Sequence, residues 1–141
     1  VERRGDKTVI VDFKTGAAEN YLRINLEKLD LQRRGTWGES IGSLQLPFYL
    51  VLYTEKKRRP IDELNALFLL LGRSRISDEI ELPLFDGSSP AEMFVPLKAL
   101  IFRLLGEITD PRIPFSPAPD IKSACPACDF KYLCGTPWVV K

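Results

Sequence analysis

The segment that most constrains the fold of this chain runs from Val9 to Lys14, with the sequence Val-Ile-Val-Asp-Phe-Lys. Its three leading apolar residues predict a buried strand, which a Thr-Gly turn ends. Because side chains alternate across a strand, Asp12 and Lys14 lie on the same face at its end. A carboxylate there can hold a divalent metal ion, and an ammonium beside it can offset charge that develops on a phosphate.

A hairpin is predicted around this strand. Val1-Glu2 has the pattern of a strand's last residues, Arg3 to Lys7 contains a Gly-Asp turn, and Thr8 to Asp12 forms the return strand. Most of the first strand would then lie upstream of residue 1, which leaves one edge of the return strand open. Open edges pair with neighbouring chains, so we expect a homodimer or a swapped arrangement to be favoured.

A helix is predicted over Ser40 to Lys57, where apolar residues recur at spacings of three and four. Its predicted inward face consists of Ile41, Leu44, Phe48, Val51 and Leu52. Pro47 lies inside this pattern and indicates a kink or a late start of the helix. The preceding segment, Ala17 to Arg34, fits neither period, and we expect it to be irregular with a short extended piece.

Two strands and a second helix are predicted next. Asn65 to Gly72 is apolar on both faces, as in a central strand, and Ile76 to Leu82 alternates like a half-exposed antiparallel strand. A helix starts after the cap residue Ser89 and runs to about Leu105. Its inward residues are Met93, Leu97, Leu100, Ile101 and Leu104. Prolines between Gly106 and Ala124 then predict an extended connector.

The composition excludes several kinds of chemistry. The 141 residues suffice for one domain, and none of them is histidine. A Ser-His-Asp triad, a Cys-His pair, a histidine-ligated zinc and an imidazole base are therefore excluded. The net charge is +1, so nucleic-acid contacts depend on local patches at 56–59, 33–34 and 73–75, each of which is otherwise a solvated turn. No stretch is long and apolar enough to span a bilayer, and no signal peptide is visible.

Two further groups of residues carry chemistry. Gln45 and Tyr49 share a face of the predicted helix and can both reach toward the strand end, although an amphipathic rim is the simpler interpretation of these two residues taken alone. Cys125, Cys128 and Cys134 have the close spacing of thiolates that bind zinc or an iron–sulfur cluster, and the alternative is three unrelated buried cysteines. A fourth ligand would lie upstream or would not be cysteine. The clustering argues against a disulfide framework and for a reducing cytoplasm.

Taken in order, Asp-x-Lys-Thr-Gly after a strand, Gln-Leu-Pro-Phe-Tyr and the cysteine triplet resemble the PD-(D/E)XK nucleases of the RecB/AddB type. The likeness runs from about Thr8 to Gly135 and is closest to the branch with an iron–sulfur staple, namely AddB-like subunits and CRISPR-associated adaptation nucleases. It implies an α/β fold with a restriction-endonuclease-like mixed sheet, flanking helices and a missing N-terminal part. Residues 1–110 would form the core, and residues 111–141 the Pro-rich connector and cysteine segment of the same domain.

The resemblance also implies roles for single residues. Asp12 would bind Mg²⁺ or Mn²⁺ together with the carbonyl of Phe13, and Lys14 would be the catalytic lysine. Gln45 and Tyr49 would orient the active site and the DNA strand. The three cysteines would give three of the four thiolates of a 4Fe–4S cluster, which would tie the tail to an N-terminal helix.

In the family, a second metal-binding Asp lies on the first hairpin strand, and a Glu or His ligand and the first cluster cysteine lie on an earlier helix. All three would lie upstream of Val1. We therefore expect the chain to be a piece of a longer bacterial cytoplasmic protein. Such a piece would bind Mg²⁺ weakly, be inactive by itself, and hold zinc or free thiols in place of the cluster.

The implied function of the full-length protein is metal-dependent exonucleolytic hydrolysis of single-stranded DNA or duplex ends, beside a helicase domain or subunit, in DNA recombination and repair. Two alternatives stay open. One is a non-catalytic nuclease-like domain that binds DNA or serves as a scaffold. The other is a small zinc-binding interaction module, which metal analysis would separate from an iron–sulfur protein.

Overall fold

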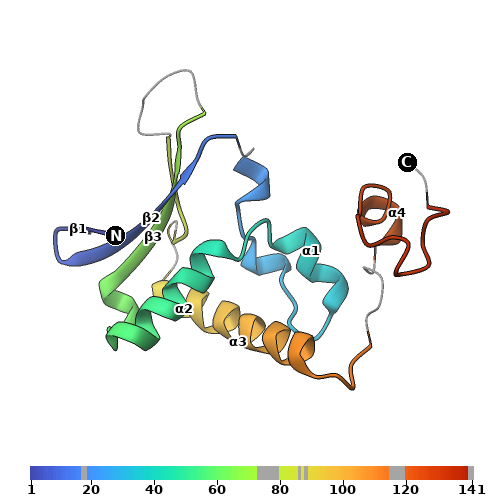
Figure 1. Ribbon diagram of the computed structural model, residues 1–141. Coiled ribbons are helices and arrows are strands. Elements are labelled where there is room, and N and C mark those ends of the chain that lie inside the picture. The colour runs from blue at the N-terminus through green and yellow to red at the C-terminus, as the bar shows by residue number, and fades with distance from the viewer. Residues whose placement is uncertain (17–18, 73–79, 86, 88, 115–119, 140–141) are drawn as a thin grey trace.

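The computed structural model describes residues 1–16, 19–72, 80–85, 87, 89–114 and 120–139. Their strands are β1 (Glu2–Arg4), β2 (Lys7–Lys14), β3 (Leu64–Leu70) and β4 (Glu81–Pro83). These form one four-stranded sheet in the order β1-β2-β3-β4, in which β2 and β3 are parallel and the outer pairs are antiparallel. The sheet is mixed and helices lie against it, as Figure 1 shows, so the predicted α/β class is confirmed.

The first two strands form the predicted hairpin. Gly5 has a φ of 61° in the turn, a conformation that glycine adopts without strain, and Glu2 pairs with Val9. Among the described residues, no strand pairs with the β1-facing edge of β2 beyond Val9. The predicted open edge is therefore confirmed from Ile10 onward, while the residues before it are paired.

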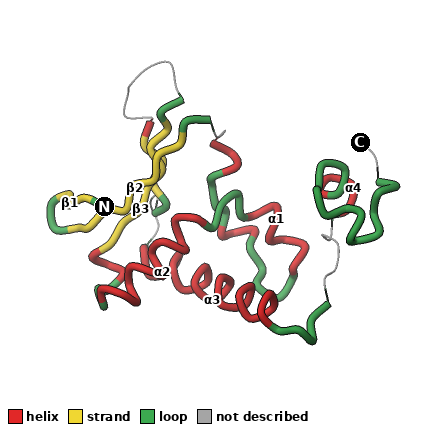
Figure 2. Tube along the Cα trace, in the orientation of Figure 1, coloured by secondary structure: helices red, strands yellow, loops and turns green. Residues whose placement is uncertain are grey.

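Residues 15–63 connect the parallel strands β2 and β3, because parallel neighbours require a crossover. Figure 2 shows this crossover as short helical turns and loops followed by one long helix. Its elements are η1 (Glu19–Tyr21), η2 (Leu26–Lys28), η3 (Arg34–Thr36), α1 (Trp37–Ser40), α2 (Gln45–Lys57) and η4 (Ile61–Glu63). The expected irregular segment is confirmed over its described part, and its short extended piece is Ile24, which forms an isolated bridge with Ile41.

The predicted single helix over Ser40 to Lys57 is wrong at its beginning, because α2 starts only at Gln45. The late start was one of the two expectations for Pro47, which lies in the first turn of α2. Proline fits there because the first N–H groups of a helix have no acceptor within it.

The predicted inward face of this helix is also wrong in part. The buried residues of α2 are Leu46, Pro47, Leu50 and Val51. Phe48 and Leu52 are 37% and 52% exposed. The reason is that the first two positions of the predicted face lie before the helix begins, so the neighbouring stripe turns toward the sheet.

The later elements agree with the sequence more closely. The central position of β3 is confirmed, and β4 is antiparallel to it, although residues 76–79 of the predicted strand lie outside the described residues. Helix α3 (Pro90–Thr109) begins at the predicted proline with Pro96 inside it. Met93, Leu97, Leu100 and Ile101 are buried as expected, and Leu104 is half-buried.

Three details of this region correct the sequence predictions. The Ser89 side chain makes no capping hydrogen bond, and instead its carbonyl accepts from Met93 N–H at 3.2 Å. The helix passes Gly106 and ends at Thr109, because an exposed glycine weakens a helix without stopping it. The connector is therefore shorter than predicted, and α4 (Ile121–Ala124) shortens it at the other end.

The core lies between one face of the sheet and helices α2 and α3. Ile10, Ala66 and Phe68 face it from the strands, and Leu50 and Ile101 meet them from the helices. Figure 1 shows α2 along this face with α3 beyond it, while α4 lies apart from both. Among the described residues, no helix is long and apolar enough to cross a membrane.

Candidate active site

The structure brings together the four side chains that the sequence singled out at the strand end and on the helix. Lys14 Nζ lies 2.7 Å from Asp12 Oδ2 and donates to Gln45 Oε1 at 2.5 Å. Gln45 Nε2 donates to Asp12 Oδ1 at 3.1 Å and to the Tyr49 hydroxyl at 2.7 Å. We call Asp12, Lys14, Gln45 and Tyr49 the quartet. Its geometry confirms that these groups converge, whereas their catalytic roles stay predictions.

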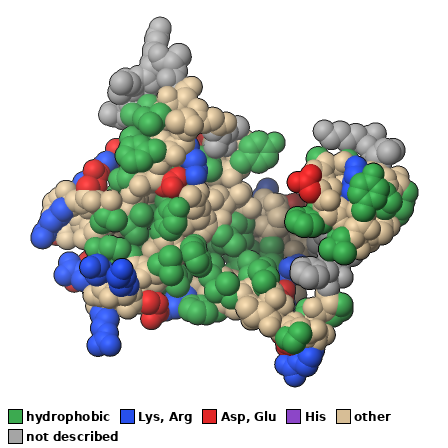
Figure 3. All heavy atoms as spheres, viewed as in Figure 1, with side chains coloured by type: hydrophobic (Ala, Val, Ile, Leu, Met, Phe, Trp, Pro, Cys, Tyr) green, Lys and Arg blue, Asp and Glu red, His purple; other side chains and the backbone are tan. Residues whose placement is uncertain are grey.

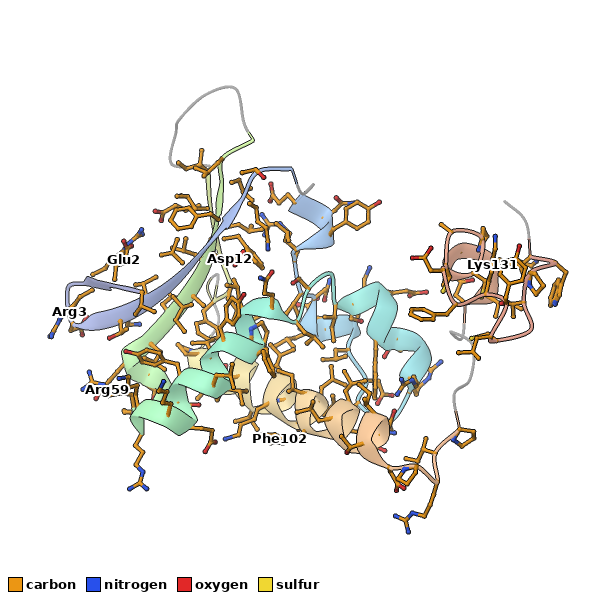
Figure 4. The ribbon with its side chains drawn as sticks, in the orientation of Figure 1. Glu2, Arg3, Asp12, Arg59, Phe102 and Lys131 are labelled. Carbon is orange, nitrogen blue, oxygen red and sulfur yellow. The ribbon has the colours of Figure 1, made fainter. Side chains whose placement is uncertain are left out.

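Topology explains why the quartet forms. Asp12 and Lys14 extend the row of side chains that Ile10 begins, so they leave the core at the carboxyl end of β2. After a parallel strand, the crossover helix starts at that same end, and this places Gln45 in the first turn of α2 above them. Tyr49 follows one turn later on the same helix face. Figure 4 shows Asp12 beside the start of α2.

The quartet is partly shielded from water. The side chains of Asp12 and Lys14 are 16% and 21% exposed. Phe68 is the register partner of Asp12 on β3, and its ring centroid lies 5.1 Å from Lys14 Nζ. An ammonium over an aromatic face is attracted by the ring, and a partly buried site strengthens every charge interaction within it.

Phe68 is a site residue that the sequence interpretation missed. It was treated only as part of an apolar central strand. The available signal was the register of two parallel strands, which pairs the residue at position 68 with the acid at position 12. A sequence without a known register does not supply that pairing.

A metal ion fits the oxygen atoms that the quartet presents. Asp12 Oδ2 is buried, and although Lys14 Nζ lies near it, no donor is aligned to give it a hydrogen bond. The Lys14 carbonyl accepts from Leu71 N–H at 2.8 Å and so points toward β3. Carbonyls alternate along a strand, and the Phe13 carbonyl therefore points toward the open edge of β2. A hard cation prefers oxygen ligands, and here these would be the Phe13 carbonyl and Asp12 Oδ2, the latter in place of its ion pair with Lys14.

The described residues hold no group of three His, Cys, Asp or Glu side chains placed to bind a metal ion. Asp12, the single carboxylate of the quartet, therefore has no acidic partners placed with it for a metal ion among these residues. Mg²⁺ is commonly bound through one or two carboxylates together with substrate phosphates. The protein oxygens at this site therefore suit a metal ion that binds together with a phosphate.

The cysteine segment lies after α4. Cys125 is buried, Cys128 and Cys134 are half-buried, and all three are free of disulfides. Cys128 N–H donates to the Cys125 carbonyl at 3.1 Å, which closes the turn between the first two cysteines. The three thiols are not gathered into a metal site in the described part of the chain, so the predicted cluster stays a prediction.

Of the predicted basic patches, one presents several free charges. Lys56, Lys57 and Arg58 are exposed at the end of α2 and have no ion-pair partner among the described residues, whereas Arg59 pairs with Glu63 at 2.7 Å. Figure 3 shows Lys and Arg side chains gathered there, and Figure 4 labels Arg59 at this end of the helix.

The other two predicted patches differ in what the structure describes of them. Arg34 pairs with Glu107 and stacks 4.9 Å from the Trp37 ring. The patch around 73–75 lies outside the described residues.

The family model for the PD-(D/E)XK nuclease superfamily matches residues 1–135 of the chain. A search of curated proteins gives no match, and a search of solved structures also gives none. The matched range contains the quartet and all three cysteines. The mixed sheet with flanking helices is consistent with the restriction-endonuclease-like fold that was predicted, and the family match does not specify a RecB/AddB subfamily.

Proposed function

The chain belongs to the PD-(D/E)XK nuclease superfamily, and from this premise we propose that the full-length protein hydrolyses phosphodiester bonds of DNA with a divalent metal ion held at Asp12. The observation that carries the proposal is the quartet itself. A carboxylate, the ammonium that it pairs with and an amide meet at the carboxyl end of a parallel strand. These groups supply part of what metal-dependent phosphate hydrolysis needs, and none of them is histidine.

The residues of the quartet have separate tasks. Asp12 Oδ2 and the Phe13 carbonyl would hold Mg²⁺ or Mn²⁺, which when bound supplies Lewis acidity toward a phosphate and acidifies water. Lys14 carries the positive charge that offsets charge on the scissile phosphate. Gln45 orients Lys14 by accepting a hydrogen bond at Oε1 and orients Asp12 by donating one from Nε2. The Tyr49 hydroxyl accepts a second hydrogen bond from Nε2 and so holds the amide in place.

The proposal extends to the type of enzyme. The order of the three motifs supports an exonuclease domain of the RecB/AddB type, which works beside a helicase domain or subunit on single-stranded DNA or duplex ends. Since Asp12 is the single carboxylate of the quartet, a further acid would have to come from outside the described residues. The chain by itself would then bind Mg²⁺ weakly and have no activity.

We further propose that Cys125, Cys128 and Cys134 ligate a 4Fe–4S cluster in the full-length protein, with a fourth ligand from elsewhere. Their spacing supports this, since cluster thiolates must converge within a few ångströms. Iron and acid-labile sulfide in the purified full-length protein are the expected result. Stoichiometric zinc without iron would contradict the cluster and favour a zinc-binding interaction module.

The nuclease proposal is tested by Lys14→Ala and Asp12→Ala in the full-length protein, assayed on single-stranded DNA with Mg²⁺ or Mn²⁺. Loss of one preorganised charge from an active site costs about 10²–10³-fold in rate, and we expect at least that loss for each variant. Lys98→Ala and Asp110→Ala are matched controls, because these residues also form ion pairs but lie away from the quartet. Unchanged cleavage in the two site variants would refute the assignment.

One observation favours a second candidate, a nuclease-like domain that binds DNA without cutting it. The quartet has one carboxylate, and the exposed basic patch at 56–58 can contact phosphates without any metal ion. In that case the affinity for DNA would fall steeply with salt concentration. No cleavage products would form, even with a divalent metal ion present and Lys14 intact.

A further inference from the structure

A cavity of about 770 Å³ lies beside the quartet. Leu46, Phe68, Leu82 and Met93 form its apolar floor, and the crossover residues 20–27, 38–40 and 42 form its wall. The floor is continuous with the quartet. Phe68 lines the cavity and its ring centroid lies 5.1 Å from Lys14 Nζ, and Leu46 directly follows Gln45.

The wall of the cavity is fixed to the rest of the fold. Asn25 N–H donates to the Ser40 carbonyl at 2.7 Å, and Gly42 N–H donates to the Arg23 carbonyl at 2.9 Å. The backbone at 42 approaches so closely that a Cβ there would lie 2.6 Å from the Tyr21 carbonyl carbon. The cavity is therefore formed before any ligand arrives, which lowers the entropic cost of binding.

The charges on the wall select against a phosphate. Glu27 and Glu39 line the cavity, and the positive charge of Arg23 is neutralised by its ion pair with Glu19. A phosphate would be repelled, whereas a flat neutral group with an apolar face and a polar edge suits an apolar floor beneath a polar wall. Nucleobases have this chemistry.

Resting on the proposed function, we infer that this cavity receives a nucleobase of the DNA strand whose phosphate lies at Lys14. Base and phosphate of one nucleotide are separated only by its sugar. A base site must therefore adjoin the phosphate site, as the shared Phe68 provides. Shape and stacking rather than a fixed hydrogen-bond pattern would make the site tolerant of sequence.

The experiment compares two fluorescent probes of equal length and charge, a single-stranded oligothymidine and its abasic counterpart. Binding to the full-length protein is followed by anisotropy with Ca²⁺ in place of Mg²⁺. Base stacking in single-strand sites corresponds to about 5- to 150-fold in affinity, and we expect the oligothymidine to bind at least 5-fold more tightly.

Two variants then change the cavity without touching the quartet. Gly42→Ala displaces the wall, and Gly38→Phe places a ring at the cavity margin, where an added Cβ meets nothing within 4 Å. We expect both variants to reduce the preference for oligothymidine at least 3-fold. Gly106→Phe on the exposed side of α3 is the matched control and keeps the preference. If Gly42→Ala does not fold, Gly38→Phe decides the question.

Equal affinity for the two probes, absence of binding, or full preference in Gly38→Phe would overturn the inference. A parallel cleavage assay with Mg²⁺ separates this failure from that of the proposed function. Cleavage without a preference for the oligothymidine would contradict only the proposed base site. Absence of cleavage would contradict the proposed nuclease function.

Discussion

Replacing Gln45 by leucine is the perturbation that most directly tests how the quartet is held together. The amide makes three hydrogen bonds, two of them to the charged groups of Asp12 and Lys14. A neutral hydrogen bond contributes about 1 kcal/mol and one to a charged group about 1.5–3 kcal/mol, so about 4–7 kcal/mol is an upper limit.

Two features of the structure reduce this limit. The side chains of Asp12 and Lys14 are 16% and 21% exposed and keep their mutual ion pair, so water replaces part of what the amide supplied. Gln45 also borders an apolar groove with Phe48 and Leu104, where a leucine gains contacts. We therefore expect Gln45→Leu to lower the free energy of unfolding by about 1–3 kcal/mol.

The assay is urea denaturation followed by circular dichroism, with DNA cleavage by the full-length protein measured in parallel. Gln32→Leu is the matched control, because Gln32 is exposed and its side chain makes no hydrogen bond among the described residues. We expect cleavage to fall at least about 10-fold in Gln45→Leu, since misplacing a positioned charge weakens transition-state stabilisation. A loss of stability no greater than that of Gln32→Leu would refute the role of the amide.

A double-mutant cycle sharpens this test. Tyr49→Phe removes the hydroxyl that accepts from Gln45 at 2.7 Å, and the coupling with Gln45→Leu should be about 0.5–1.5 kcal/mol. Tyr53 lies one turn further along α2, and its hydroxyl has no hydrogen-bond partner among the described residues. Tyr53→Phe should therefore show no coupling, and equal coupling in both cycles would contradict the bond.

Three further outcomes are expected. Asp12→Asn should abolish Mn²⁺ binding by the isolated chain, measured by electron paramagnetic resonance. Gly72→Ala should lower the free energy of unfolding by about 1–3 kcal/mol in urea denaturation, because its Cβ would lie 2.5 Å from the Thr15 carbonyl oxygen. The hydrogen bond from Arg4 lowers the pKa of Glu81 below its ordinary value of 4.5. The ionised Glu81 therefore stabilises the fold fully at pH values above 4.5, and this contribution is lost as the pH falls through the lowered pKa. The pair is half-exposed and screened, so Glu81→Gln should cost less than about 1 kcal/mol at neutral pH and nothing in strong acid.

Matched variants check these outcomes. Asp110→Asn should leave Mn²⁺ binding unchanged, and an equal loss would show that Asp12 acts only through stability. Gly106→Ala, where an added Cβ meets nothing within 4 Å, should not destabilise the protein. A constant difference between Glu81→Gln and the parent chain from neutral to acid pH would contradict the ion-pair explanation.

The sequence predicts the members of the quartet because each of its two pairs follows from a short repeat. Asp12 and Lys14 are two residues apart on a strand, and Gln45 and Tyr49 are four apart on a helix, so each pair shares a face whatever surrounds it. Bringing the two pairs together required only that the helix start at the carboxyl end of the strand. The sequence could not show that Gln45 contacts both Asp12 and Lys14, since this depends on where α2 begins.

What the sequence did not predict depends on contacts between distant segments. The cavity wall relies on the bridge of Ile24 with Ile41, and no periodic pattern identifies an isolated bridge. The predicted buried face of α2 lies one stripe away from Leu46 and Leu50, because its first two positions, Ile41 and Leu44, precede the helix. Helix α3 continues past Gly106 to Thr109, because one exposed glycine weakens a helix without ending it.

These contacts also explain why position 45 suits an amide. Lys14 requires an acceptor, Asp12 requires a donor, and the Tyr49 hydroxyl accepts a second donor. A carboxylate offers acceptors alone and would repel Asp12, while a second lysine would offer donors alone and repel Lys14. The glutamine side chain satisfies all three neighbours without adding charge. The charge of the quartet therefore stays with one acid and one base, which pair with each other at 2.7 Å until a cation binds Asp12 and a phosphate binds Lys14.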